Sequence, residues 1–116
     1  MSPNPSSFLP LSPAVLHILL ALSGEDRHGY GIMQEVARES GNQYKLGPGT
    51  LYENLQRLLA QGLICEAARR DAEDPRRRYY RLTTLGKRVA ITEINRLESA
   101  LRKAKAHLSS AKVRNA

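Results

Sequence analysis

The chain has 116 residues, the size of one domain, and 41% of them are hydrophobic, which is enough for a modest core. Its 18 lysine and arginine residues outnumber 11 aspartate and glutamate residues, and the formal charge of +7 favours a polyanionic partner such as nucleic acid or an anionic membrane surface. The sequence has no apolar run long enough to span a membrane, and its single cysteine, Cys65, excludes an intramolecular disulfide, so we expect a cytoplasmic protein.

An arm and a short helix are predicted at the start of the chain. Residues 1–10 are rich in serine and proline and lack the basic-then-apolar order of a signal peptide, so we expect them to be disordered. A serine followed by proline then predicts a helix over residues 13–23. Apolar side chains surround most of this helix, so it must be buried on two sides. Leu16 and Leu20 are therefore candidates for contact with a second copy of the chain.

A second helix is predicted over residues 28–40, because the following glycine and asparagine favour a helix end. Its periodicity predicts that the core-facing side chains are Tyr30, Met33, Val36 and Ala37. The outward side chains are predicted to be Gln34, Glu35, Arg38 and Glu39. A loop then leads to the central segment of the chain.

The central segment, residues 46–63, predicts a third helix. Pro48 suits the first turn of a helix and Gly62 supplies a left-handed end. One face is an apolar stripe of Leu51, Leu55, Leu58 and Leu59. The other face carries Thr50, Glu53, Asn54, Arg57 and Gln61. Such side chains can bond base edges or phosphates in a major groove, and a solvated helix face is the alternative. Two helices, a turn and this third helix match a helix-turn-helix pattern.

Two short strands, over residues 63–68 and 79–82, predict a β-hairpin after the third helix. In the second strand, Tyr80 and Leu82 are predicted to face inward, with Tyr79 and Arg81 outward. Residues 69–88 contain eight basic and three acidic side chains, so most of the net charge lies here. A hairpin in this position is a wing, and its likeliest DNA contacts are Arg76, Arg77 and Arg78. The alternative is a charged loop that only contacts solvent.

A long final helix is predicted over residues 84–110, with Thr83 as its cap. Its length of roughly 40 Å, at 1.5 Å per residue, exceeds what the compact domain can cover. An apolar residue recurs at alternating spacings of four and three, as in a coiled coil, at Ala90, Ile94, Leu97, Leu101, Ala104 and Leu108. The pattern predicts a homodimer, and packing against the chain's own core is the alternative.

Four segments together carry a family resemblance: LSPAVLHILLAL, RHGYGIMQEV, LGPGTLYENLQRLLAQGLI and RRRYYRLTTLGKR. In order and spacing, residues 11–88 resemble the PadR family of bacterial transcriptional regulators, in its short form with a single C-terminal dimerisation helix. The resemblance implies a winged-helix dimer that binds a palindromic operator and usually represses transcription. It places Thr50, Tyr52, Asn54 and Arg57 on the recognition helix and Arg76 to Arg78 on the wing.

The same resemblance implies that a phenolic acid or hydrophobic drug could release the DNA. Some members stack flat drugs on a tryptophan in the dimer pore, and this chain has no tryptophan. From geometry, Thr50, Glu53 and Asn54 are expected at base edges, and the turn around Gly49 presents backbone N–H groups to a phosphate. Tyr52 either contacts a phosphate or fills the junction between helix and wing.

The sequence as a whole predicts a mostly α fold with a small β-hairpin. It comprises a winged helix-turn-helix domain over residues 11–83, a dimerisation helix over 84–110 and a basic tail over 111–116. Its predicted function is sequence-specific binding of double-stranded DNA as a homodimeric repressor. A winged-helix module that contacts protein or RNA is the alternative.

No cofactor or metal site is predicted, and an enzyme is disfavoured. The three histidines, His17, His28 and His107, lie on predicted helices without nucleophile–base spacing. His17 is interpreted as a packed histidine, because no cysteine or histidine lies at ligand spacing from it. Cys65 either packs beside the core or senses redox state.

Overall fold

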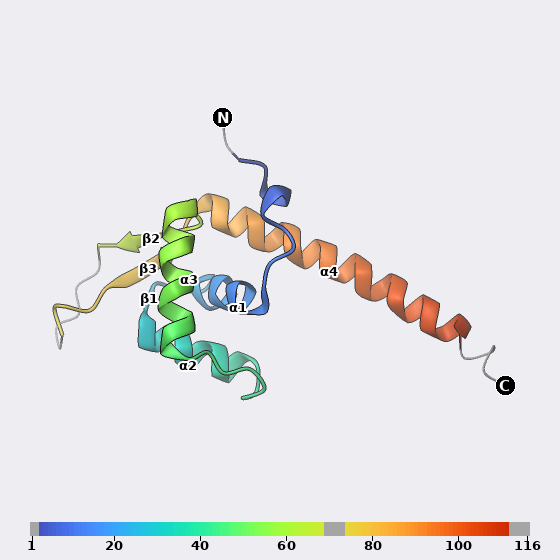
Figure 1. The fold of residues 1–116 in the computed structure, drawn as a ribbon, viewed down its shortest axis with the longest axis horizontal. Helices are drawn as coiled ribbons and strands as arrows, with labels where there is room; N and C mark the ends of the chain where they lie inside the picture. Colours follow the sequence, from blue (N-terminus) through green and yellow to red (C-terminus); the bar gives the residue numbers. More distant parts are fainter. Residues whose placement is uncertain (1–2, 69–73, 112–116) are drawn as a thin grey trace.

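The computed structural model describes residues 3–68 and 74–111, and Figure 1 shows helices arranged around a small sheet, with one long helix leaving the domain. This confirms the predicted mostly α architecture with a wing. In chain order the elements are η1 (Pro5–Phe8), α1 (Pro13–Leu22), β1 (Arg27–His28), α2 (Gly29–Glu39), α3 (Pro48–Gln61), β2 (Ile64–Ala67), β3 (Tyr79–Leu82) and α4 (Thr84–Ala111). No helix within the described ranges is both long enough and apolar enough to cross a membrane.

The helix ends follow from local side-chain chemistry. The Ser12 hydroxyl accepts a hydrogen bond from the Val15 amide at 3.2 Å and so caps α1. Gly62 ends α3 in the left-handed conformation, with φ of 74°. The Thr83 hydroxyl accepts from the Gly86 amide at 3.0 Å and donates to the Gly62 carbonyl at 2.7 Å. Thr83 therefore caps α4 and ties its start to the end of α3.

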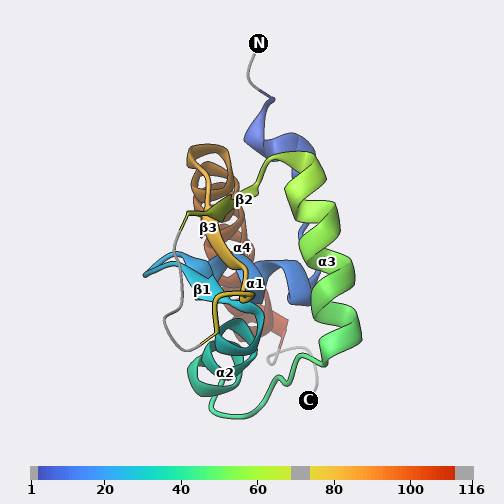
Figure 2. The same ribbon diagram turned by 90° about the vertical axis from the view of Figure 1, so that its left-hand side faces the viewer.

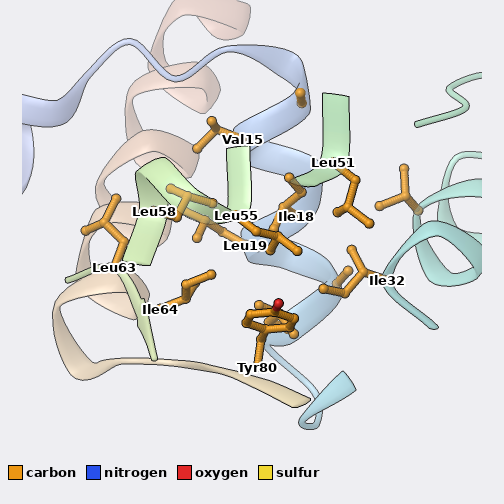
Figure 3. Close-up of a cluster of buried hydrophobic side chains, with 14 of the residues drawn as sticks. Val15, Ile18, Leu19, Ile32, Leu51, Leu55, Leu58, Leu63, Ile64 and Tyr80 are labelled. Atoms are coloured by element: carbon orange, nitrogen blue, oxygen red, sulfur yellow. The ribbon is translucent and has the colours of Figure 1, made fainter. Parts of the chain in front are cut away.

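The core forms where α1, α2 and α3 meet the sheet and the first turns of α4 (Figure 3). Its fully buried members come from every one of these elements and include Ile18, Leu19, Ile32, Leu51, Leu55, Leu58, Leu63, Ile64 and Val89. Aliphatic side chains dominate, in keeping with the low aromatic content of 5%. This core fixes the orientation of α3, because its leucine stripe lies against α1.

The sheet has three antiparallel strands in the order β1-β3-β2, one more than the predicted hairpin. The extra strand pairs His28 with Tyr79, and their rings make an edge-to-face contact with centroids 5.2 Å apart. Tyr79 is consequently buried, and the prediction that it faces outward is wrong. Alternation along a strand separates its two faces, but whether each face is buried depends on the elements that pack against it.

The arm, predicted to be disordered over residues 1–10, is structured where it is described. The side chain of Asn4 caps η1 by accepting from the Ser6 amide at 3.0 Å. Phe8 and Leu9 pack against the core, and the Leu11 amide donates to Glu93 of α4 at 2.8 Å. Burial of these apolar side chains opposes the disorder that the serine and proline content predicts.

The inward face of α2 also differs from its prediction. Tyr30 is 58% exposed, whereas Ile32 and Val36 are buried. Val36 is buried and Met33 packs against the core, as predicted, but the buried stripe runs through Gly29 and Ile32 to Val36 and leaves Tyr30 outside it. Glu35 was predicted to face outward but is buried beside Arg38, which donates to both of its carboxylate oxygens.

Most of α4 extends beyond the domain (Figure 1). The molecule measures 64 × 38 × 22 Å, and its radius of gyration is 17.2 Å, whereas about 13 Å is expected for a compact chain of this length. Ala90 is buried in the chain's own core, but the apolar side chains that follow it, from Ile94 at 42% to Leu108 at 69%, are exposed. The distal half of α4 therefore does not pack against the described part of its own chain.

Candidate nucleic-acid interface

The outward face of α3 is polar over its whole length. Because Leu51, Leu55 and Leu58 point into the core, the exposed side chains include Thr50, Tyr52, Glu53, Gln56 and Arg57. Glu53 and Arg57 are one helical turn apart with 3.7 Å between their charged atoms. Both side chains are largely solvent-exposed, so this ion pair is weak and leaves both groups available to a ligand. Figure 2 shows α3 along one edge of the molecule, beside the sheet.

Asn54 does not lie on this outward face. It is only 9% exposed, and its side-chain amide donates to the Thr50 carbonyl at 2.8 Å. The prediction that Asn54 lies on the exposed polar face is wrong, because Asn54 falls within the 3.6-residue stripe of the buried leucines. Gln56 takes the equivalent outward position and was missed. The leucine spacing could have predicted the burial of Asn54, since Asn54 lies three residues after Leu51.

The first turn of α3 has no side-chain cap. Gly47 occupies the cap position, and no described side chain accepts a hydrogen bond there. The amides of Gly49 and Thr50 belong to the first turn, where backbone N–H groups lack partners within the helix. This turn can offer donors to an anion, as the sequence predicts for the segment around Gly49.

The wing places three consecutive arginines on the side of the loop that leads into β3. Arg76, Arg77 and Arg78 are all exposed. Arg76 approaches Asp74 at 3.7 Å, and Arg78 approaches Glu66 across the hairpin at 3.4 Å. One guanidinium nitrogen of Arg77 lies 3.3 Å from the His28 ring. Arg69 and Arg70, which also contribute to the predicted basic region, lie outside the described residues.

A cleft of about 290 Å³ separates the wing from the start of α2 and from α3. It is lined by the three wing arginines and by His28, Tyr30, Tyr52 and Tyr80. Burial, together with Glu66 and Tyr52, raises the pKa of Tyr80, whereas Arg78 opposes that rise. Tyr30 and His28 were not among the predicted site residues, because only the pairing of β1 with β3 brings them to the wing.

Apolar surface remains exposed on α4 and half-exposed on α1. Leu97 and Leu101 are exposed, and Leu16 and Leu20 of α1 are half-buried within the chain. His17, between those two leucines, stacks on Tyr44 with ring centroids 4.5 Å apart. This stacking agrees with its interpretation as a packed histidine.

The described residues contain no group of three or more histidine, cysteine, aspartate or glutamate side chains that could hold a metal ion. Cys65 is half-buried on β2, opposite Arg81 of β3.

Comparison with known proteins identifies the family. The model of the PadR-like family of transcriptional regulators matches residues 15–91, more than half of the chain. The chain belongs to this family. The match extends from α1 through the wing into α4, so it includes every element of the candidate interface.

Two relatives are similar to this chain in sequence. A transcriptional regulator of Mycobacterium tuberculosis is 41% identical over 81 residues, which cover 70% of this chain and 71% of that protein. An uncharacterised protein of Lysinibacillus sphaericus is 41% identical over 71 residues; these cover 60% of this chain and 64% of that protein, slightly less than two thirds of its length.

Solved structures of transcriptional regulators share the fold. A PadR family transcription regulator from Clostridium difficile has a TM-score of 0.72 at 26% identity, covering 84% of this chain and 99% of its own. A transcriptional regulator from Clostridium thermocellum has a TM-score of 0.68 at 25% identity, covering 79% and 89% respectively. The winged-helix architecture and the family resemblance predicted from sequence are confirmed.

Proposed function

We propose that this PadR-family chain is a homodimeric repressor that binds a palindromic site in double-stranded DNA. The observation that carries the proposal is the exposed polar face of α3 beside a wing with three consecutive arginines. The formal charge of +7 supports a polyanionic partner.

In this proposal α3 enters the major groove with its N-terminal half. Thr50, Glu53 and Gln56 reach base edges, and Arg57 reaches a guanine or a phosphate. Glutamine pairs well with adenine, and arginine pairs well with guanine, so this face can discriminate among base pairs. The Glu53–Arg57 ion pair is exposed and costs little to break when the groove offers new partners.

The wing and the first turn of α3 hold the phosphate backbone. Arg76 to Arg78 supply positive charge, and the uncapped turn at Gly49 supplies backbone donors. These contacts set the register of the protein on DNA, and they read no bases.

The dimer forms through the exposed apolar side chains of α4, joined by Leu16 and Leu20 of α1. The alternating spacing of Ile94, Leu97, Leu101 and Leu108 suits a helix from a second copy. Two recognition helices would then meet half-sites about 34–36 Å apart, or a multiple of that distance.

Release by a small hydrophobic or phenolic ligand is part of the proposal. A cavity of about 140 Å³ between α1 and α2 is lined by Leu20, Ala21 and Val36 and also by His17, Glu35 and Glu39. Its position beside Leu20 would link occupancy by such a ligand to the dimer face.

Selection of bound sequences from a random duplex pool tests the proposal. Enrichment of a palindrome with half-sites at the predicted spacing is the expected result. Parallel titrations with single-stranded DNA and RNA address the alternative of a winged-helix module with another partner. Tighter binding to RNA than to any selected duplex, or an enriched site without two-fold symmetry, would contradict the proposal.

A further inference from the structure

The cleft between the wing and α2 has a distinctive composition. Three of its lining residues are arginines, and none of the described residues that line it is acidic. The nearby carboxylates of Asp74 and Glu66 pair with Arg76 and Arg78 from outside the cleft. A small volume bounded by several guanidinium groups favours a compact anion, and a planar guanidinium donates well to phosphate oxygens.

Three tyrosines line the same volume. Tyr30 and Tyr52 are 58% and 50% exposed and approach from α2 and α3, while Tyr80 lies on β3. A methyl group added at Gly29 would lie 2.6 Å from the Tyr52 hydroxyl. Glycine at this position therefore leaves room for the tyrosine ring to lie over the start of α2, with its hydroxyl beside the cleft.

The size of the cleft limits the class of ligand. At about 290 Å³ it lies just below the range of about 300–1,000 Å³ that is usual for small-molecule sites. Such sites carry a few placed polar groups on a mainly apolar lining. This cleft is lined by three arginines and three tyrosines, whose side chains combine apolar surface with guanidinium and hydroxyl donors. A phosphate group with little attached to it fits both the volume and the donors.

We infer that this cleft binds a single phosphate group, held between the wing arginines and the hydroxyls of Tyr30 and Tyr52. The phosphate comes either from the DNA backbone, in which case the inference rests on the proposed function, or from a free phosphorylated compound. In both cases the phosphate joins α2, α3 and the wing, three segments that are distant in sequence. The phosphate therefore fixes the wing relative to the recognition helix.

The first arm of the test uses DNA in which single phosphates are replaced by neutral methylphosphonates. The variant Tyr30→Phe/Tyr52→Phe removes only two hydroxyls, and Tyr44→Phe makes the same change outside the cleft. We expect the double variant to bind the selected duplex about tenfold more weakly, with unchanged base preference. A methylphosphonate at one particular phosphate in each half-site should weaken DNA binding by the wild type much more than DNA binding by the double variant.

The second arm uses no DNA. Inorganic phosphate is titrated at constant ionic strength while the backbone amide signals of residues 28–31 and 76–80 are followed by NMR. We expect saturable shifts in the wild type and in Tyr44→Phe, with about tenfold weaker binding in the double variant.

The two arms distinguish the sources of the phosphate. Coupling to one DNA phosphate supports the backbone as the source, and saturable binding of inorganic phosphate without such coupling supports a free phosphorylated ligand. Neither effect, in a double variant that folds like the wild type, would overturn the inference. Failure of the random duplex selection would instead count against the proposed function, because the phosphate titration is independent of DNA.

Discussion

At the scale of single residues, two buried glutamates hold parts of the domain together. Glu35 on α2 pairs with Arg38 and lies 3.7 Å from Arg27, and Glu93 on α4 pairs with Arg96 and accepts from the Leu11 amide. The Arg38 hydrogen bond lowers the pKa of Glu35 to about 2, although burial opposes this. The Arg96 hydrogen bond is likewise the main cause that lowers the pKa of Glu93.

The first prediction concerns acid stability. Both folded-state pKa values lie below those of the unfolded chain, so each carboxylate stabilises the fold above the unfolded value. This contribution is lost as the pH falls through the folded pKa, which for Glu35 means from about 4.5 towards 2. Urea unfolding across this pH range should show declining stability. The Glu35→Gln variant should have a lower free energy of unfolding at neutral pH, and this free energy should fall less steeply with acidification than in the wild type. An equal pH dependence in the two proteins would contradict a stabilising role for the Glu35 carboxylate.

The second prediction separates Asn54 from Gln56. Asn54 is buried and bonds the Thr50 carbonyl, so Asn54→Ala should lower the free energy of unfolding by about 1–2 kcal/mol. It should leave base preference unchanged. Gln56→Ala should have the opposite effects. It should change stability little and should reduce the discrimination against wrong bases at one base pair by about 1–3 kcal/mol. Denaturation measures the effect on stability, and binding to operators with single base-pair substitutions measures the effect on base preference. If Asn54→Ala altered base preference and Gln56→Ala lowered stability, the roles given to the two residues would be refuted.

At the scale of elements, close contacts between segments determine where the wing and α4 lie. The start of α4 approaches the end of α3 so closely that a methyl group added at Gly86 would clash with the Leu63 carbonyl oxygen. Backbone atoms cannot move aside as flexible side chains do. Glycine at this position therefore permits the tight junction between α4 and the first residues of the wing.

The third prediction tests that junction. Gly86→Ala should lower the free energy of unfolding by about 1–3 kcal/mol, because the added methyl forces α4 away from Leu63. Gly24→Ala is the matched control, since nothing lies within 4 Å of its added methyl group. The control should change stability by less than about 0.5 kcal/mol. Equal stability of the two variants would show that the junction is looser than described.

The fourth prediction concerns the wing. If Arg77 contacts a phosphate, Arg77→Ala should weaken binding to all duplexes alike and should flatten the salt dependence by about one ion. Arg102→Ala removes an exposed arginine from distal α4 and serves as the control. Binding constants measured over a series of salt concentrations give the slope. An unchanged slope for Arg77→Ala would exclude this wing contact.

At the scale of the whole molecule, α4 has a long apolar surface that residues 3–68 and 74–111 do not cover. A radius of gyration of 17.2 Å records how far this helix projects from the domain. An exposed apolar stripe of this kind is typical of a protein interface. We therefore expect that two domains joined through α4 bind DNA as a unit.

The fifth prediction tests the dimer. Leu101→Glu places a charge in the apolar stripe and should yield monomers in sedimentation experiments, with much weaker operator binding. Lys103→Glu introduces the same side chain at a position outside the stripe, so this control should remain dimeric. A wild-type chain that sediments as a monomer at micromolar concentration would remove the basis for the predicted interface.

The sequence by itself determined the features that depend on neighbouring residues. Caps at Ser12 and Thr83, the left-handed end at Gly62 and the leucine stripe of α3 act within a few residues, so their patterns could be recognised. The four family segments, the wing arginines and the long final helix are likewise local signals. Together they were sufficient to predict the winged-helix fold and the family.

Only the tertiary structure decided which side chains meet across long separations. The pairing of β1 with β3 buries Tyr79 and brings His28 and Tyr30 to the wing, and the packing of the arm against α4 buries Glu93. These contacts join segments about 50 or 80 residues apart. Helical and strand periodicity describes one element at a time, whereas burial depends on what the rest of the chain places against it.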